Sequence, residues 1–390
     1  MRKIISVLTA TRAEYGLLKP LIKKLDLMEK FDVRVVVTGM HLSIEHGSTL
    51  NEIKNDGIKI DKEIEILMAS DTAVSISKSM GLAMISFAEY FSELKPNLLV
   101  VLGDRYETLA VCCAAVNSQI PIAHLHGGET TEGAVDEAFR HSITKMSCLH
   151  FTSTETYRRR VLQLGEHPQQ VFNVGAIGVE IINNLEYMTK EEFEKSINMR
   201  IKKKLALLTF HPVTLESNTG EGQLINILEA LNEFDDLQVI ITKANADLGG
   251  RAINKLIDEY VEQRGEKFVA FASLGQRRYL SAIKYCDFVI GNSSSGIIEV
   301  PTFKKPTINI GDRQKGRVQA KSIINCEPMK PDIIDAVNKA LSNEFIDLLN
   351  NLENPYGKGN TSYLIVSEII NFFKDEKFTL KKHFYDLIGK

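Results

Sequence analysis

The sequence predicts an α/β protein with two Rossmann-like lobes, each a doubly wound parallel sheet. Short β-branched runs alternate with helical patterns in both halves of the chain, as is typical of βαβ units around a parallel sheet. The runs lie at 3–9, 32–38, 97–102, 121–125, 149–152 and 171–174, and then at 205–210, 237–242, 267–271, 287–291 and 306–310. The length of 390 residues also fits two lobes, because a domain takes roughly 150 residues.

The first run and the last helical pattern mark the ends of this arrangement. The run at 3–9 is too short for a secretory signal and passes directly into polar residues, so we interpret it as the first core strand. A Lys/Glu-rich stretch at 185–204 is the expected connection between the lobes. We therefore predict an N-terminal lobe over 1–180, a C-terminal lobe over 181–360, and an amphipathic helix within 361–390 that packs back across the lobes.

Composition restricts the possible function. The net charge of −3 provides no overall basic field, so we expect no nucleic-acid partner and a small anionic ligand met by local cations. No apolar run approaches the roughly 18 residues that span a bilayer, so no membrane partner is expected. Five scattered cysteines without a C-x-x-C pair are expected to be reduced and buried, as in a cytoplasmic protein: Cys112, Cys113, Cys148, Cys286 and Cys326.

Polar clusters follow the predicted strands where ligands of open α/β sheets bind, outside the strands' carboxyl ends. The clusters lie at 11–16, 103–105, 126–129, 211–212, 292–296 and 311–313. A single cluster, such as Gly-Asp-Arg at 103–105, could equally be a turn closed by an ion pair. Together the clusters predict one site in the cleft between the lobes.

The segment 291–296, Gly-Asn-Ser-Ser-Ser-Gly, leads from an apolar run into a helical pattern. Its amides and the hydroxyls of Ser293 and Ser294, close to Gly296, make it a candidate phosphate cradle. Simple N-capping by serine is the alternative. Glu299 could accept hydrogen bonds from a ribose diol, or could be only a favourable carboxylate in a first helical turn. Neither a Walker pattern nor G-x-G-x-x-G is present, which argues against ATPase and dinucleotide functions.

Cations stand at strand ends of both predicted lobes. Arg12 and Arg313 could neutralise a diphosphate from two sides, a task that suits guanidinium groups. His211 is either a turn residue or a donor to a phosphate oxygen or to the departing group.

The segment 124–141 is unusually rich in titratable groups. His124 and His126 could suggest zinc. However, alternate residues of a strand face opposite sides, and no H-E-x-x-H motif or cysteine supports a metal. We therefore predict no metal and no cofactor.

In combination, these motifs resemble the UDP-N-acetylglucosamine 2-epimerase superfamily, which has the fold of the GT-B glycosyltransferases. Within it they are similar to the hydrolysing, NeuC-type branch of sialic-acid and related nonulosonic-acid pathways. The motifs are T-R-A-E-Y-G at 11–16, V-T-G-M-H at 37–41, G-D-R at 103–105, H-G-G-E at 126–129, D-E-x-x-R-H-S-I-T-K at 136–145, H-P-V-T at 211–214, G-N-S-S-S-G at 291–296 and G-D-R-Q-K-G-R at 311–317.

The resemblance implies roles for particular residues. The residues implied to contact the diphosphate or nearby groups are Arg12, His211, Asn245, Ser293, Ser294 and Arg313. Tyr279 matches a residue that stacks on uracil, and Glu299 matches the ribose carboxylate. Asp104, Glu129 and Asp136 match acidic residues of the catalytic region. His126 occupies the position at which many hydrolysing relatives carry a carboxylate, so the acid and base roles stay open. His126 and His211 are therefore further catalytic candidates.

The implied reaction is hydrolytic 2-epimerisation of UDP-N-acetylglucosamine. UDP is eliminated to leave a glycal, which is hydrated to N-acetylmannosamine, and the enzyme is a homodimer or homotetramer. The alternatives are the same chemistry on UDP-2,4-diacetamido-2,4,6-trideoxyglucose of the legionaminic acid route, reversible 2-epimerisation without release, a GT-B glycosyltransferase, and a two-lobed sugar-binding protein.

Overall fold

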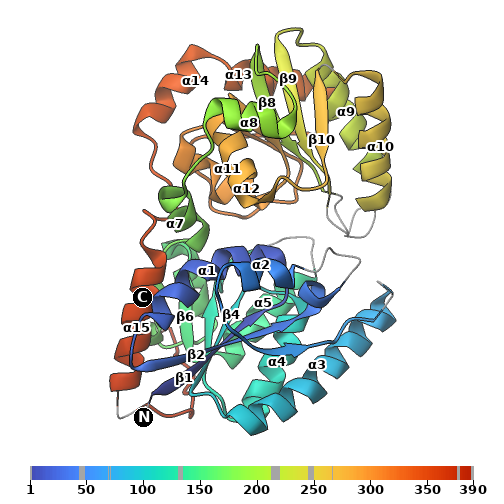
Figure 1. Ribbon diagram of the computed structural model, residues 1–390. Coiled ribbons are helices and arrows are strands. Elements are labelled where there is room, and N and C mark those ends of the chain that lie inside the picture. The colour runs from blue at the N-terminus through green and yellow to red at the C-terminus, as the bar shows by residue number, and fades with distance from the viewer. Residues whose placement is uncertain are drawn as a thin grey trace. The chain divides into compact units, whose positions relative to one another are not determined.

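The computed structural model contains two compact units, each built on a parallel sheet (Figure 1). It describes residues 2–43, 49–68, 70, 72–130, 135–211, 220–244, 250–265, 267–375 and 378–387. The first unit takes Met1–Glu129, Val135–Ile181 and Tyr356–Lys390, and the second takes Thr130–Ala134 and Ile182–Pro355. The lobe boundaries at 180 and 360, and a terminal helix that crosses both lobes, remain predictions.

The sheet of the first unit has seven parallel strands in the order β3-β2-β1-β4-β5-β6-β7. The strands are β1 Lys3–Thr9, β2 Phe31–Thr38, β3 Ile60–Ile64, β4 Leu98–Leu102, β5 Ile122–Leu125, β6 Leu149–Thr152 and β7 Val171–Asn173. The helices are α1 Arg12–Asp26, α2 Leu50–Asn55, α3 Ala73–Leu94, α4 Tyr106–Asn117, α5 Asp136–Met146, α6 Glu155–Gln163, α7 Ile177–Asn184 and α15 Thr361–Lys374, with 3₁₀ turns at Gly39–Leu42 and Pro168–Gln170.

The sheet of the second unit has six parallel strands in the order β10-β9-β8-β11-β12-β13. The strands are β8 Lys204–Thr209, β9 Leu237–Thr242, β10 Phe268–Phe271, β11 Phe288–Gly291, β12 Thr307–Ile310 and β13 Ile323–Cys326. The helices are α8 Lys190–Ile197, α9 Gly220–Asn232, α10 Gly250–Gln263, α11 Gly275–Tyr285, α12 Ser294–Ile298, α13 Lys330–Ala340 and α14 Asn343–Leu348, with 3₁₀ turns at Val300–Phe303 and Leu349–Asn351.

The doubly wound arrangement is confirmed in the first unit by β4, whose alternate side chains pack into two different hydrophobic clusters on the two faces of the sheet. Leu98 and Val100 of β4 join the cluster that contains α1 and α15, whereas Leu99 and Val101 join the cluster that contains α3 and α4. Because successive residues of a strand face opposite sides, a sheet covered by helices on both faces needs such continuous apolar strands. This is why the runs were recognisable in the sequence.

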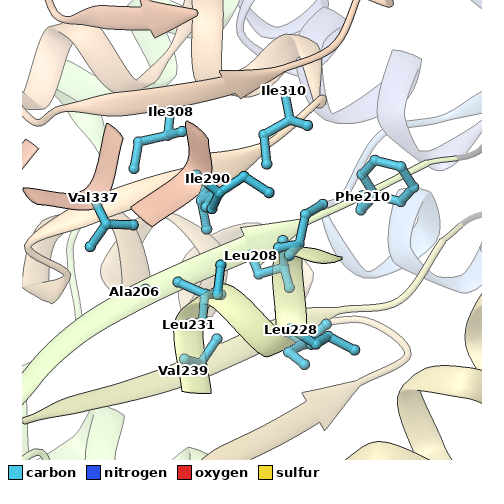
Figure 2. Packing of buried hydrophobic residues seen from close by; sticks show 14 of the residues in the cluster. Ala206, Leu208, Phe210, Leu228, Leu231, Val239, Ile290, Ile308, Ile310 and Val337 are labelled. Carbon is cyan, nitrogen blue, oxygen red and sulfur yellow. The ribbon is translucent and has the colours of Figure 1, made fainter. Parts of the chain in front are cut away.

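In the second unit one face of the sheet packs against α9 and α13. Figure 2 shows Leu208 of β8 near Leu228 of α9, and Val337 of α13 on the side of Ile290 and Ile308 of the neighbouring strands. All of these side chains are at most 1% exposed. This core holds β8, β11 and β12 side by side. The polar clusters at 211–212, 292–296 and 311–313 follow the carboxyl ends of these three strands.

Local signals also account for the first helix. Thr11 and Glu14 form a capping box at the start of α1, and Tyr15, Leu18 and Leu25 lie on its buried face.

All five cysteines are free thiols, of which three are buried and two are half-buried. Among the described residues, no helix has the length and apolar character needed to cross a bilayer.

Candidate active site

In the first unit, Arg140 joins the ends of β4 and β5. Its side chain is 4% exposed; Nη2 donates to Asp104 Oδ2, and Nη1 lies 3.8 Å from Glu129 Oε2. The guanidinium comes from the second turn of α5, and the two carboxylates follow different strands. Burying this charge is costly unless it is paired, and the pairing fixes both acids at one edge of the sheet.

His126 adds an imidazole to this cluster. Its φ of 66° is unusual for a residue with a Cβ, and its N–H donates to Phe151 O at 2.8 Å. Nδ1 lies 2.9 Å from Glu129 Oε1, which also accepts the Ser153 hydroxyl at 2.6 Å. Nε2 is buried and has no hydrogen-bond partner among the described residues. An imidazole oriented by a carboxylate, with its second nitrogen available, is suited to proton transfer.

Asp136 begins α5, one turn before Arg140. Burial and the negative charge of Asp104 raise the pKa of Asp136, against the opposing charge of Arg105. A carboxyl in this setting holds its proton to higher pH than usual and is suited to act as an acid.

His124 has a structural role. Its Nε2 lies 2.8 Å from Gly103 O and its Nδ1 lies 3.2 Å from Thr144 Oγ1, so both ring nitrogens have partners. Burial lowers the pKa of His124 to about 3, which keeps the ring neutral. In the part of the chain that the structure describes, no three histidine, cysteine or acidic side chains are arranged to hold a metal ion.

At the end of β1, Arg12 and Glu14 occupy the first turn of α1. The Arg12 side chain is 44% exposed, with its Nε 3.9 Å from Glu52 Oε2, so its charge faces solvent. Glu14 Oε2 accepts the N–H groups of Ala10 (2.8 Å) and Thr11 (3.1 Å), while Oε1 is buried without a partner among the described residues. Burial raises the pKa of Glu14 to about 7, although the charge of Arg105 opposes the shift.

We expect Glu14→Gln to become more stable than the wild-type protein as pH rises. Because the folded-state pKa is raised, the carboxyl supports the fold fully below its unfolded value of 4.5 and loses that contribution as pH rises to about 7. The amide has no such loss, so the gain reaches up to about 3 kcal/mol, at about 1.36 kcal/mol per pKa unit. Urea unfolding of both proteins at about pH 5 and about pH 8 measures their free energies of unfolding. If the difference between the variant and the wild type is the same at both pH values, the prediction is wrong.

In the second unit, Asn292 connects three strand ends. The residue is 1% exposed; its side chain accepts the His211 N–H at 2.8 Å and donates to His211 O at 2.7 Å. Its own carbonyl accepts Arg313 Nη1 at 3.0 Å and Gln314 Nε2 at 2.8 Å. The turns after β8, β11 and β12 are therefore held together by one buried residue: the Asn292 side chain fixes His211, and its main-chain carbonyl holds Arg313.

The predicted phosphate cradle follows β11. Gly291 (φ 129°) is required there, since a Cβ would lie 1.9 Å from Thr209 O. Ser293 caps α12 and accepts the Ser295 N–H, half-buried Ser294 starts the helix, and Gly296 packs against Thr307. Because α12 spans only Ser294–Ile298, its dipole is short, and the amides and hydroxyls of the turn itself are the groups available to an anion.

Tyr279 and Glu299 meet through Ser295. The Tyr279 hydroxyl donates to Ser295 Oγ at 3.0 Å, and Ser295 Oγ donates to Glu299 Oε2. Burial raises the pKa of both Tyr279 and Glu299. The two residues expected to hold the nucleoside thus lie beside the same serine, next to the cradle.

Sequence reasoning did not select five residues that organise these clusters: Arg140, Ser153, Asn292, Ser295 and Gln314. Arg140 was visible four residues after Asp136, and Asn292 and Ser295 lie within the serine-rich motif, whereas nothing in the sequence marks Ser153. The expected contact residue Asn245 lies outside the described residues.

Two doubly wound parallel sheets, each with polar side chains at the carboxyl ends of its strands, define a GT-B-like α/β enzyme. The chain belongs to the UDP-N-acetylglucosamine 2-epimerase family, whose model matches residues 23–370. The predicted family and fold are therefore confirmed.

Named relatives are similar over most of the chain. The GDP/UDP-N,N'-diacetylbacillosamine 2-epimerase (hydrolyzing) of Campylobacter jejuni is 43% identical, covering 88% of this chain and 89% of its own. Polysialic acid biosynthesis protein P7 of Escherichia coli is 39% identical, covering 99% and 98%. The crystal structure of UDP-GlcNAc 2-epimerase from Neisseria meningitidis bound to UDP-GlcNAc superposes with a TM-score of 0.81 at 19% identity, covering 95% and 100%, which shows the shared fold.

Proposed function

We propose that this protein hydrolyses UDP-N-acetylglucosamine with inversion at C2, which releases UDP and N-acetylmannosamine for a sialic-acid-type pathway. The observation that carries the proposal is the buried cluster in which Arg140 joins Asp104 to Glu129 and His126 pairs with Glu129. It supplies several proton-transfer groups at one sheet edge. Similarity to hydrolysing 2-epimerases over most of the chain supports the same reaction.

The order of bond breaking follows from the weak acidity of the C2 hydrogen. A base cannot remove that proton at a useful rate unless the bond from C1 to the UDP oxygen breaks first or at the same time. Stabilisation of the departing UDP must therefore dominate. In the second unit, Arg313, His211 and the turn at Ser293 are the proposed source of preorganised charge and donors for it. The resemblance implies Arg12 as a further cation. Once the C2 proton and UDP have left, the sugar is a glycal.

The acidic residues of the first unit carry out the proton transfers of both the elimination and the hydration. Asp104, fixed by Arg140, accepts the C2 proton, and Asp136 can deliver one because its pKa is raised. Water adds its oxygen to C1 as a proton returns to C2 from the opposite face. The His126–Glu129 pair, whose nearest atoms are 2.9 Å apart, takes the proton that the attacking water loses. The products are UDP and a free sugar with inverted C2.

A second candidate substrate is UDP-N,N'-diacetylbacillosamine. The Campylobacter jejuni relative that carries this sugar in its name is 43% identical, against 39% for the polysialic acid protein. Both candidates undergo the same bond changes at C1 and C2, so they differ only in the substituents that the protein must accommodate.

The deciding experiment is a panel of UDP-sugars followed by NMR without any acceptor and with EDTA, because the proposed mechanism uses cationic side chains in place of a metal. We expect UDP and a free 2-epimerised sugar from one of the two candidates. An intact 2-epimerised nucleotide sugar would instead indicate reversible epimerisation, and UDP release only after an acceptor is added would indicate glycosyl transfer.

In D₂O, the released sugar is expected to carry deuterium at C2. The original C2 proton leaves when the glycal forms, and the proton that returns on the other face comes from a group in exchange with solvent. Proton NMR of the free sugar measures the C2 signal directly. Product made in D₂O that keeps its C2 proton would rule out elimination followed by hydration.

We also propose that the protein is a cytoplasmic homodimer or homotetramer that self-associates through α3. Val74 and Ile85 are 63% exposed and Leu82 is 41% exposed, and they share one face of α3 with exposed Lys78 and Glu89. An antiparallel pairing that sets Leu82 opposite Ile85 of a second copy also sets Lys78 opposite Glu89. Light scattering should give a dimer or tetramer for the wild type, and for Ile85→Glu a monomer from the dimer or a dimer from the tetramer; a monomeric wild type contradicts the proposal.

A further inference from the structure

The chain continues past α15, and residues 379–387 pack against the first unit at the C-terminal end of α5. Lys382 Nζ donates to the carbonyl oxygens of Lys145 (2.8 Å) and Ser147 (2.7 Å). The last carbonyls of a helix have no partner within it, and a cation there also interacts favourably with the helix dipole. Lys382 therefore caps α5 from a position more than two hundred residues away in sequence.

Lys382 also completes a cluster of charges around a buried carboxylate. Its Nζ lies 2.6 Å from Glu166 Oε2, and Glu166 is 1% exposed. The same carboxylate is 2.6 Å from Lys145 Nζ and 2.9 Å from His150 Nε2. Burial raises the pKa of Glu166, but the hydrogen bonds from His150 and the two lysines outweigh burial and bring it to about 2. The carboxylate is therefore ionised, and loss of one lysine leaves a buried charge less well compensated.

Two aromatic residues hold the same segment. Phe384 lies on Gly165, where an added Cβ would come within 2.4 Å of the ring, and Lys145 Nζ is 5.1 Å from the ring centroid. The Tyr385 N–H donates to Gly165 O at 2.9 Å, and its ring lies 5.3 Å from that of His167. Phe384 and Tyr385 therefore anchor the segment two and three residues after Lys382, which helps to hold Lys382 in place.

The contacts lead to the candidate active site by two routes. The first is α5 itself: Lys382 holds its C-terminal end, while its first two turns carry Asp136 and Arg140. The second route passes through the sheet. His150 of β6 is in register with His124 of β5, and the Nε2 atom of His124 lies within hydrogen-bond distance of the Gly103 carbonyl. Gly103 directly precedes Asp104.

We propose that residues 379–387 form an intramolecular strap, and that Lys382 is a positioning residue that fixes α5 so that Arg140 and Asp136 keep their places beside Asp104. The proposal rests on the function proposed above for its effect on catalysis, but its effect on α5 is independent of that function. Loosening α5 should disturb proton transfer more than nucleotide binding, because Asn292 and Arg313 belong to the other unit.

The test compares Lys382→Met with the matched control Lys381→Met. Methionine keeps most of the apolar stem of lysine and removes the charge, and Lys381 is an exposed neighbour. We expect Lys382→Met to speed amide hydrogen exchange in α5 and to lower kcat, each roughly tenfold, with less than about a twofold change in KM. Lys381→Met should match the wild type in both amide exchange and kcat. Lys382→Arg keeps the positive charge and should stay close to the wild type in both measurements.

A second arm removes the segment and returns it. A chain that ends at residue 377 should show the same faster exchange in α5, and a synthetic peptide of residues 378–387 should slow it again. Phe384→Ala, which leaves the charge cluster intact, replaces Lys382→Met if that variant does not fold, with the same expected result.

The outcomes separate the strap from the proposed function. Unchanged exchange in α5 in Lys382→Met and in the shortened chain would overturn the strap. Faster exchange with unchanged kcat would show that the segment only stabilises α5 and would overturn the positioning role. If the wild type releases UDP from no sugar in the panel, the proposed function fails, while the exchange measurement still decides whether the strap exists.

Discussion

Asp104→Asn is expected to lose roughly 10²- to 10⁴-fold in kcat, the usual contribution of a general acid–base group. Asparagine keeps the size of the side chain and an oxygen that can accept the hydrogen bond of Arg140, so the cluster should stay folded. It cannot take a proton from C2 of the sugar. UDP affinity should change little, because the predicted nucleotide contacts are concentrated in the second unit. Single-turnover kinetics and calorimetry with UDP measure the two effects separately.

The matched control is Asp61→Asn. Asp61 is also an aspartate of the first unit paired with an arginine, Arg34 Nη1 at 2.8 Å, but it lies near the amino end of β3, away from the carboxyl ends of the strands. Its substitution should leave kcat close to that of the wild type. If Asp104→Asn instead binds UDP poorly and turns over bound substrate normally, Asp104 has a structural role and the assignment of the catalytic unit is wrong.

Arg313→Ala is expected to raise KM and lower kcat together. The side chain is held by Asn292 O, and its charge would bind the diphosphate and stabilise it further as negative charge develops on departing UDP. One charge-assisted contact is worth about 1.5–3 kcal/mol, which corresponds to roughly 10- to 150-fold in kcat/KM. Steady-state kinetics with the accepted UDP-sugar measures the loss.

Two further variants define what Arg313 contributes. Arg313→Lys keeps the charge but loses the planar pair of donors, so its activity should fall between those of the alanine variant and the wild type. Lys315→Ala, in the same loop, removes a side chain that is 61% exposed and paired with Asp312, and should have little effect. Near-normal kinetics in a folded Arg313→Ala protein would remove Arg313 from the site.

The strands buried on both faces could be predicted from local sequence, and so could the edge strands β7 and β10, but the edge strands β3 and β13 could not. Within the run at 97–102, residues 98–102 are continuously apolar because helices cover both faces of β4, so their composition alone marks the strand. β3 carries Asp61, Lys62 and Glu63, as edge strands often do, and β13 has only four residues at the other sheet's edge. These two strands exist because a neighbour offers a hydrogen-bonding edge, which their own sequences do not indicate.

Local sequence predicts polar clusters at the carboxyl ends of particular strands, because each cluster directly follows an apolar run and the parallel strands of a sheet bring their carboxyl ends to one edge. Which side chains meet at that edge depends on how the chain packs. Arg140 pairs with Asp104 across 36 residues, and Asn292 joins His211 across 81. Such partners are set by how helices and strands pack, and by the high cost of leaving a buried charge or amide unpaired. The local hydrophobic periodicity does not indicate either of these long-range pairs.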